Sequence, residues 1–304
     1  MMQKSYELFI GDRLFSSWSL RGWLMLEAFG LPHRDHAVGL YSGGIGAALA
    51  GLGTARTVPV LRTPDGWVLT DSLAIAETLH ELHPDAGLWP QDGAARALAR
   101  SMVAEMHAGF DALRAECPMM LAHGWSDFTP SQGVREDLQR IERLWSRARM
   151  RFGAGGRWLF GRYSLADVFF APVAMRIATY ALPVGDTARA YTAAHLCDRR
   201  VRQWRATGMT QDYDPMPYRM DLPRAPWPGP APRPARAVET GTPENALCPF
   251  SGKPVSTLME TDGRIIGFCN PVCRDKVVAD PDAWPQVRRL LRAAPARQDT
   301  AVDA

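Results

Sequence analysis

The stretch Ser16-Ser17-Trp18-Ser19-Leu20-Arg21 lies where a strand pattern gives way to a helical pattern. We expect the strand over residues 6–10 and the helix over residues 18–29. Unpaired backbone N–H groups and the positive end of the helix dipole surround a hydroxyl at such a helix start, and this setting favours an anion. Ser16 or Ser17 could therefore donate to a thiolate and lower the pKa of the thiol. Serines at this position are also common N-caps, so the motif by itself leaves both interpretations open.

Two further elements stand at the start of a strand and the start of a helix. In Thr57-Val58-Pro59-Val60-Leu61, a trans Pro59 would be a plain turn residue, whereas a cis Pro59 would turn the Val58 backbone toward a ligand. The Val58 N–H and C=O could then pair with a peptide as a short added strand. Further on, the Ser72 hydroxyl could bind a carboxylate and Asp71 an ammonium group. The alternative for Asp71 and Ser72 is a plain helix cap.

In this order and spacing, the three elements resemble the N-terminal, thioredoxin-like domain of the glutathione transferase superfamily. The first element is similar to that of the serine-type zeta class, whose members are maleylacetoacetate isomerase-like. The resemblance implies that Ser16, with Ser17 as the second choice, activates the sulfur of glutathione. It also implies glutathione-binding roles for Val58, Pro59, Asp71 and Ser72. Trp18 stands where zeta enzymes commonly have a cysteine.

The following region has long helical periodicities and no competing strand pattern. We expect helices over residues 96–121 and 134–152. Ser164 and Asp167 have the spacing of a capping box, in which each side chain pairs with a backbone N–H at the helix start. This matches the N-capping motif of the transferase C-terminal domain. The resemblance therefore implies an α/β thioredoxin-like domain followed by an all-α domain.

The only sequence signal for a pocket that binds the electrophile is a row of residues on one face of the predicted helix over residues 96–121. Phe110 follows Met106 and His107 by four and three residues, and with Glu105 and Arg114 these residues form a stripe that could face a substrate cleft. Core packing is the simpler interpretation for Met106 and Phe110, and a satisfied structural histidine is the simpler one for His107. We carry all three as candidate pocket residues for a small electrophilic substrate.

Three cysteines near the C-terminal end form a separate pattern. Cys248 precedes a predicted β-hairpin, and Cys269 and Cys273 lie between that hairpin and a predicted helix. Thiolates suit zinc or copper(I), although a closed zinc site normally has four ligands. The pattern resembles the YHS/TRASH group of small metal-binding domains, which implies a ββα, treble-clef-like module. Because residues 246–285 contain few large apolar groups, we expect the metal to contribute much of the module's folding free energy.

A proline-rich segment separates the predicted helical domain from the cysteine-rich module. Prolines crowd residues 215–237, a density that excludes a helix or an interior strand and indicates an extended linker. The organisation that we predict is a thioredoxin-like domain over 1–83, a helical domain over 90–214, a linker over 215–243, a cysteine-rich module over 244–293 and a disordered tail over 294–304.

The resemblance implies a glutathione S-transferase or zeta-like isomerase that acts as a homodimer. The alternatives are a non-catalytic glutathione- and metal-binding protein and a metal-sensing or trafficking protein that uses the cysteine module. The net charge of +3 and the scattered basic residues argue against a nucleic-acid partner. No apolar stretch is long enough to span a membrane, and Lys4 and Glu7 interrupt any signal-peptide pattern, so we expect a cytoplasmic protein.

Overall fold

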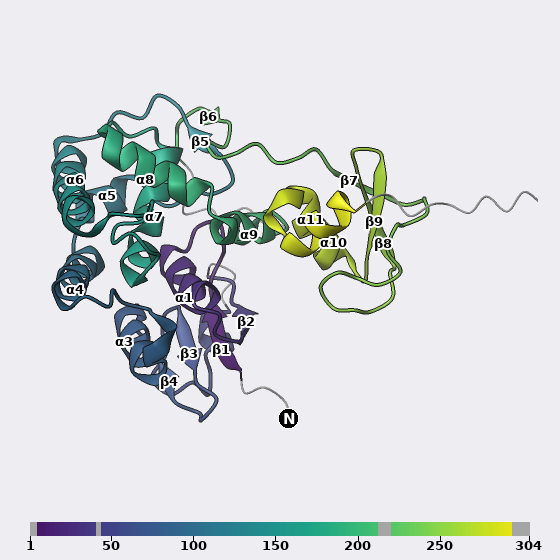
Figure 1. Ribbon diagram of the computed structural model, residues 1–304, viewed down its shortest axis with the longest axis horizontal. Coiled ribbons are helices and arrows are strands. Elements are labelled where there is room, and N and C mark those ends of the chain that lie inside the picture. Colours follow the sequence, from purple (N-terminus) through teal and green to yellow (C-terminus); the bar gives the residue numbers. More distant parts are fainter. Residues whose placement is uncertain (1–4, 41–43, 212–219, 294–304) are drawn as a thin grey trace, which may run out of the picture. The chain divides into compact units, whose positions relative to one another are not determined.

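A computed structural model describes residues 5–40, 44–211 and 220–293 of the chain. Within these ranges the chain divides into two compact units (Figure 1). The first unit holds residues 5–40, 44–201 and 220–229, and the second holds residues 202–211 and 230–293.

The first unit begins with a four-stranded mixed sheet in the order β2-β1-β3-β4. Strand β1 pairs with β2 in parallel and with β3 antiparallel, and β3 pairs with β4 antiparallel. Helices α1 and α3 pack against each other beside this sheet. The elements are β1 Tyr6–Ile10, α1 Ser17–Ala28, β2 His33–Ala37, α2 Ile45–Ala48, β3 Val60–Arg62, β4 Val68–Leu69 and α3 Ser72–Leu82. This β-α-β and β-β-α order is the thioredoxin-like arrangement expected from the sequence.

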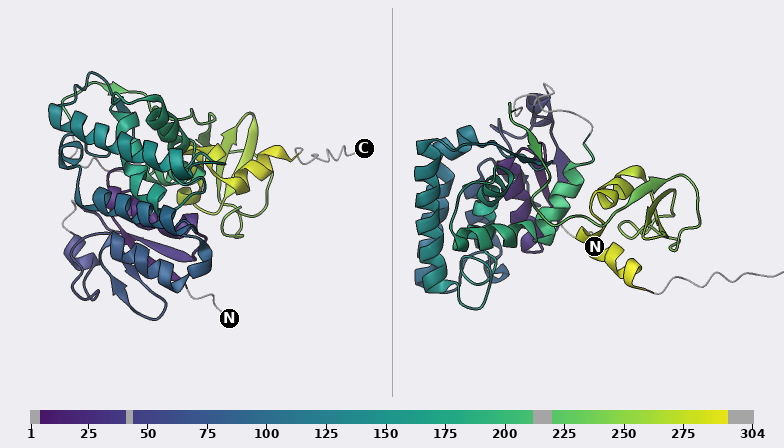
Figure 2. Two further views of the ribbon diagram at one scale, coloured as in Figure 1. Left: turned by 60° about the vertical axis from the view of Figure 1, so that its left-hand side comes forward. Right: turned by 90° about the horizontal axis from the view of Figure 1, so that it is seen from above.

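The rest of the first unit is mainly helical, and Figure 2 shows its long helices beside the sheet layer. Its apolar helix α7 is almost wholly buried and packs against α1, α4 and α8. The elements are η1 Pro84–Ala86, α4 Gly93–Ala108, α5 Asp111–Glu116, β5 Gly124–Trp125, α6 Gln132–Phe152, α7 Leu165–Thr179, α8 Asp186–Leu196, α9 Arg199–Gly208 and β6 Arg224–Ala225. Helix α9 runs on into the second unit, and β6 pairs with β5 from within the proline-rich segment.

The capping box at the start of α7 is confirmed. Ser164 N–H donates to Asp167 Oδ2 at 2.9 Å, and the Ser164 hydroxyl donates to the same oxygen at 3.2 Å. Leu159 N–H and the Tyr191 hydroxyl donate to Asp167 Oδ1 at 3.1 and 2.9 Å. Burial raises the pKa of Asp167 to about 6, although these donors oppose the rise. The carboxyl group therefore fixes the start of the buried helix.

The single helix expected over residues 96–121 is wrong. Helix α4 ends at Ala108, and α5 starts after Phe110, whose φ of 64° lies in the left-handed region. Arg114 turns back from α5 and donates to the carbonyl oxygens of Gly109 (2.8 Å), His107 (3.3 Å) and Met106. These contacts satisfy carbonyl groups that the end of α4 leaves unpaired. The break places Arg114 beside the cleft described below.

The second unit is a three-stranded antiparallel sheet, in the order β7-β8-β9, with two short helices. The elements are β7 Arg236–Val238, β8 Thr257–Thr261, β9 Arg264–Phe268, α10 Pro271–Ala279, η3 Pro281–Ala283 and α11 Pro285–Arg292. The β8–β9 hairpin and α10 agree with the predicted hairpin and helix. The Arg202 guanidinium from α9 forms a two-armed ion pair with the buried Asp280 carboxylate, at 2.6 and 2.8 Å.

The expectation that residues 246–285 contain too few apolar groups for a core is wrong. The second unit has an apolar core, formed by Ala206, Cys248, Met259, Ile266, Phe268, Val277, Ala283, Trp284 and Val287. Ala206 and Val287 lie outside residues 246–285, so part of the core comes from α9 and α11. The core stabilises this unit together with any bound metal.

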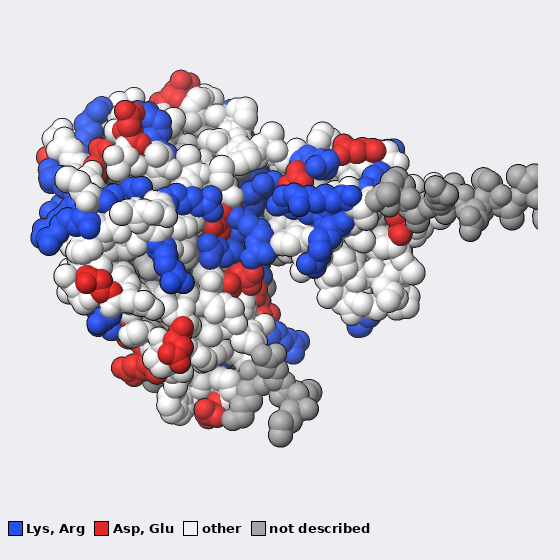
Figure 3. All heavy atoms as spheres, viewed as in Figure 1, with Lys and Arg blue, Asp and Glu red and all other residues white. Residues whose placement is uncertain are grey.

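The surface carries charges of both signs. Figure 3 shows acidic and basic side chains on the visible face of the first unit, as the net charge of +3 leads one to expect. Over the described ranges of the chain, no helix is long and apolar enough to cross a membrane.

Candidate functional site

A cavity of about 390 Å³ lies in the first unit, between the start of α1 and the helical part. Its volume falls within the roughly 300–1,000 Å³ typical of small-molecule sites. Three of the predicted site residues line it, namely Ser16, Ser17 and Val58. The rest of the lining is Phe15, Trp18, Leu40, Ile45, Thr57, Arg114, Pro118, Met119 and Arg176. The cavity therefore combines three hydroxyl side chains, Ser16, Ser17 and Thr57, and two guanidinium groups with mostly apolar walls.

Ser16 is the N-cap of α1 and is 6% exposed. Its Oγ accepts a hydrogen bond from Ser19 N–H at 3.2 Å and donates to Ser19 Oγ at 2.8 Å. Ser19 Oγ in turn accepts from Gly11 N–H at 2.9 Å. The Ser16 hydroxyl thus fixes the start of the helix through its two contacts with Ser19.

Ser17 is the first residue of α1 and is 7% exposed. Its Oγ accepts a hydrogen bond from Arg176 Nη2 at 3.0 Å. Arg176 also donates to the carbonyl oxygens of Cys117 at 2.7 Å and Pro172 at 3.2 Å. The guanidinium is 6% exposed and links α1, α7 and the segment after α5.

The Val58–Pro59 peptide bond is cis, which was one of the two forms considered from the sequence. Helix α1 approaches this segment closely at Gly22. A Cβ atom at Gly22 would lie only 2.8 Å from Pro59 Cβ and 3.4 Å from Leu8 Cδ1. Glycine at position 22 therefore allows the Val58 segment to lie against the helix that carries Ser16 and Ser17.

Asp71 and Ser72 start α3 as expected. Asp71 Oδ1 accepts from Leu73 N–H at 2.8 Å and Ala74 N–H at 3.0 Å, so Asp71 is the N-cap. Ser72 is 2% exposed, and its Oγ has no hydrogen-bond partner in the described part of the chain. An uncommitted hydroxyl at a helix N-terminus can donate to an anion.

His107 lies next to this helix start. Its Nε2 is 3.3 Å from Asp71 Oδ2, and its ring meets the Trp18 ring edge-on at a centroid distance of 5.3 Å. Burial lowers the pKa of His107, Arg21 and Arg114 lower it further, and Asp71 opposes them. The imidazole is therefore mainly neutral at pH 7. The structure thus connects a predicted pocket residue with a predicted glutathione-binding residue.

Met106 and Phe110 lie elsewhere. They are 1% and 7% exposed and do not line the 390 Å³ cavity. Their assignment to an electrophile pocket stays a prediction.

The sequence interpretation missed Arg176, one of the two arginines that line the cavity. Arg176 comes from the apolar helix α7, where a lone charged residue was a usable signal. Arg21 lies behind Trp18, is fully buried, and has no hydrogen-bond partner for any guanidinium nitrogen within the described residues. Its Cζ is 4.6 Å from the Trp18 ring centroid, and the Arg114 Cζ is 5.1 Å from that centroid. Burial lowers the pKa of Arg21, and Arg114 and Arg176 lower it further.

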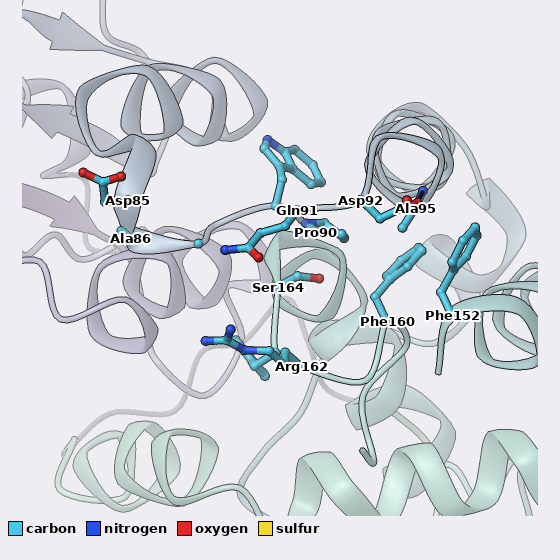
Figure 4. Close-up of a pocket in the computed structure, with 13 residues that line it drawn as sticks. Asp85, Ala86, Pro90, Gln91, Asp92, Ala95, Phe152, Phe160, Arg162 and Ser164 are labelled. Carbon is cyan, nitrogen blue, oxygen red and sulfur yellow. Dashed lines mark hydrogen bonds between the residues drawn. The ribbon is translucent and has the colours of Figure 1, made fainter. Parts of the chain in front are cut away.

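A second cavity, of about 250 Å³, lies elsewhere in the first unit (Figure 4). The rings of Phe152 and Phe160 form one wall, with centroids 6.0 Å apart. None of the candidate site residues predicted from the sequence lines this cavity. Its remaining lining is Asp85, Ala86, Gly87, Trp89, Pro90, Gln91, Asp92, Ala95, Arg162, Tyr163 and Ser164.

The cysteine cluster belongs to the second unit. The Sγ atoms of Cys248, Cys269 and Cys273 all lie within 4.8 Å of one another. Cys269 Sγ accepts from Ser251 Oγ at 3.1 Å and from Asn270 Nδ2 at 3.2 Å. Burial opposes ionisation of Cys248, but the backbone N–H groups of Ser251, Phe250 and Cys269 outweigh it and lower the pKa of this thiol to about 6. Burial raises the pKa of Cys273 to about 11. Donors that stabilise thiolates suit a soft or borderline metal ion.

Comparisons with known proteins agree with this geometry. Residues 15–82 match the family model described as glutathione S-transferase, N-terminal domain. A crystal structure of a glutathione transferase homologue from Burkholderia gl BGR1, with bound glutathione, has a TM-score of 0.53 and 23% identity; the match covers 68% of this chain and 100% of that chain. The first unit has the glutathione S-transferase fold. A glutathione transferase from Methylococcus capsulatus gives a TM-score of 0.50 at 22% identity, covering 68% and 100% of the two chains.

One curated relative is similar to part of the chain. The protein named "Probable maleylacetoacetate isomerase" from Caenorhabditis elegans is 36% identical over 104 residues, or 33% of this chain. The aligned part is 48% of that protein, about half of its length. Together these findings show the glutathione S-transferase fold for the first unit and a match to the N-terminal domain model over residues 15–82. The family model ends at residue 82, so the resemblance of the cysteine module to YHS/TRASH domains stays a prediction.

Proposed function

We propose that the first unit binds glutathione and activates its thiol for conjugation to, or isomerisation of, a small electrophile. The observation that carries this proposal is the cavity, in which the helix-start serines Ser16 and Ser17 and the Val58 backbone lie together. In this proposal Val58 and Pro59 hold the cysteinyl backbone of glutathione. Asp71 binds the γ-glutamyl ammonium group and Ser72 binds its carboxylate.

Ionisation of the glutathione thiol needs a hydrogen-bond donor to the sulfur and positive charge nearby. A thiol ionises more readily when a hydroxyl donates to the thiolate and when cationic groups lie nearby. One serine supplies the donor, and Arg114 and Arg176 supply positive charge from the same cavity. The thiolate, not the thiol, is the nucleophile that attacks the electrophile.

Calorimetric titration with millimolar glutathione tests the binding step. We expect saturable heat for the wild type. Ser72→Ala removes a hydrogen bond to a charged group, worth about 1.5–3 kcal/mol, so the affinity should fall about 10- to 100-fold. Ser101→Ala is the matched control, because Ser101 is exposed on α4 and its hydroxyl donates to the carbonyl oxygen of Ala97 in the same helix. A flat wild-type titration would remove the proposal.

Turnover tests the chemical step. Loss of the serine that donates to the thiolate should lower turnover toward a generic electrophile about 100-fold or less, since each 1.36 kcal/mol is a factor of ten. Ser16→Ala and Ser17→Ala are compared for this purpose. A wild type that binds glutathione but consumes no electrophile from a broad panel would favour the non-catalytic alternative.

We also propose that Cys248, Cys269 and Cys273 of the second unit bind one thiophilic metal ion, with zinc preferred over copper(I). The close approach of the three sulfur atoms favours this second function. The bound ion would tie the loop at Cys248 to the start of α10. Among the described residues no histidine or acidic side chain joins the cluster, so a fourth ligand would come from solvent or a partner.

Elemental analysis of protein purified anaerobically without chelator tests the metal site. We expect a stoichiometric metal that is lost in the triple Cys→Ser variant, with glutathione binding unchanged. Cys197→Ser serves as the matched control, because Cys197 is an exposed cysteine outside the cluster. Protein that holds no metal and takes up neither zinc nor copper(I) would show that the cysteines are structural.

A further inference from the structure

The two serines at the start of α1 differ in what their hydroxyl groups are free to do. A guanidinium can only donate, so Ser17 Oγ must be the acceptor in its 3.0 Å bond to Arg176 Nη2. The Ser17 O–H proton therefore points away from Arg176 and can be donated to another group. Ser17 lines the cavity, so an acceptor bound there is within its reach.

Ser16 is committed in the opposite sense. Its hydroxyl accepts from Ser19 N–H and donates to Ser19 Oγ at 2.8 Å. Donation to a ligand would require the Ser16–Ser19 hydroxyl bond to reverse, with Ser19 Oγ as its donor. The same motif thus contains one hydroxyl that caps the helix and one whose proton is uncommitted.

We propose that Ser17 donates the hydrogen bond to the glutathione thiolate and that Arg176 is the positioning residue that orients Ser17 for this task. The inference rests on the proposed function, because it needs glutathione in the cavity. The thiol proton leaves to solvent, Ser17 keeps its own proton in the hydrogen bond to sulfur, and no covalent bond to the protein forms. Arg176 stays charged throughout.

Arg176 is held firmly enough for this role. Its other donors bond to the carbonyl oxygens of Cys117 at 2.7 Å and Pro172 at 3.2 Å, and the residue is 6% exposed. These bonds come from two separate segments, so the guanidinium is fixed before any ligand binds. Ser17 is thereby preorganised, which lowers the cost of orienting it when the thiolate forms.

The surrounding charges favour the same outcome. Arg114 and Arg176 line the cavity, and no aspartate or glutamate is among the described residues that line it. Arg21 adds a buried cation behind Trp18 that has no hydrogen-bond partner in the described residues. Asp71, which faces His107, is the acidic group that interacts with Arg21. The cationic excess lowers the pKa of a thiol placed beside Ser17.

The test is the pKa of the thiol of bound glutathione, measured from the ultraviolet absorbance of the thiolate as the pH is raised. We expect Ser17→Ala to raise this pKa by about one unit, because one donor to a charged group is lost. Ser16→Ala should lower the melting temperature through loss of the N-cap but shift the thiol pKa by less than half as much. Arg176→Met should raise the thiol pKa at least as far as Ser17→Ala does, and Arg176→Lys should recover part of the shift.

A matched control distinguishes a purely structural role of Arg176 from a role in orienting Ser17. Arg149 also donates to backbone carbonyl oxygens, of Trp158 at 2.6 Å and Gly156 at 3.1 Å, and it does not line the cavity. Arg149→Met should reduce stability without shifting the thiol pKa. If Arg176→Met does not fold, Ser17→Ala with Arg176→Lys provides the test. Their shifts should be less than additive, because both changes remove the same oriented hydroxyl.

Two results would overturn the inference. A pKa shift in Ser16→Ala with none in Ser17→Ala would make Ser16 the donor and leave the proposed function intact. Additive shifts for Ser17→Ala and Arg176→Lys would show that Arg176 does not act through Ser17. Failure of the wild type to bind glutathione is a different result, because it removes the proposed function itself.

Discussion

Replacing Gly22 with alanine tests how closely α1 must approach the segment that would hold glutathione. A Cβ atom at position 22 would lie 2.8 Å from Pro59 Cβ and 3.0 Å from Pro59 Cγ. Carbon atoms prefer about 3.5–4.0 Å, so the helix and the proline ring must separate by at least about 0.7 Å. A proline ring cannot swing aside as the end of a flexible side chain can. The displacement therefore reaches Val58.

The change in unfolding free energy of Gly22→Ala follows from two opposing effects. Overpacking costs about 1–3 kcal/mol, and alanine regains up to about 1 kcal/mol over glycine in a helix. We expect a net loss of about 0–2 kcal/mol in the free energy of unfolding. Glutathione affinity should fall about five- to tenfold, since one displaced hydrogen bond at Val58 is worth about 1 kcal/mol.

Thermal unfolding and calorimetric titration measure the two effects, with Gly93→Ala as the matched control. Gly93 also lies in a helix, but a Cβ atom there would meet nothing within 4 Å. Gly93→Ala should leave glutathione affinity unchanged and keep or slightly raise the melting temperature. Wild-type affinity and stability in Gly22→Ala would refute the packing argument.

Three further predictions concern stability and assembly. Ser164→Ala removes the N-cap of α7 and should lower the unfolding free energy of the first unit by about 0.5–2 kcal/mol, measured by denaturant titration; an unchanged value would contradict the role of the capping box. Burial lowers the pKa of His195 to about 3, so below pH 6.5 the unfolded chain binds a proton that the folded chain does not. Stability should therefore fall as the pH is lowered from 6.5 toward 3, and His195→Gln should flatten this dependence in denaturant titrations at several pH values; an equally steep dependence in the variant would count against it. We expect a homodimer that buries apolar surface of the sheet domain, such as the 55%-exposed Trp67, against a partner's helical domain; light scattering should give the dimer mass, and a clean monomer at micromolar concentration would contradict it.

Elements with local signals could be predicted from the sequence. The start of α1 at Ser16, the start of α3 at Asp71 and the capping box at Ser164 each depend on residues only a few positions apart. The break between α4 and α5 could not be predicted in this way. Gly109 is only a weak sequence signal for a helix end. The contacts that stabilise the break are made by Arg114, which donates to the carbonyl oxygens of Gly109 and Met106 once the chain has turned.

The residues of the candidate site also differ in whether a local sequence signal predicts them. Ser16, Ser17 and Val58 were found because motifs place them at the ends of local elements. Arg176 was not, because its bond to Ser17 joins residues 159 positions apart in the chain. A cation in an apolar helix is a signal that it has a partner, but the sequence does not say which one.

In the second unit the three cysteines predicted as metal ligands lie together, but the expectation about the apolar core was wrong. The three cysteines were identified from short spacing, and their sulfur atoms do lie together. The expected scarcity of apolar core was wrong, because Ala206 from α9 and Val287 from α11 complete a core that also contains Phe268 and Trp284. Large buried aromatic side chains contribute several kcal/mol without any metal. Metal binding would then act mainly on the loop at Cys248 and the start of α10, and its removal would loosen these two segments while the β8–β9 hairpin keeps its core contacts.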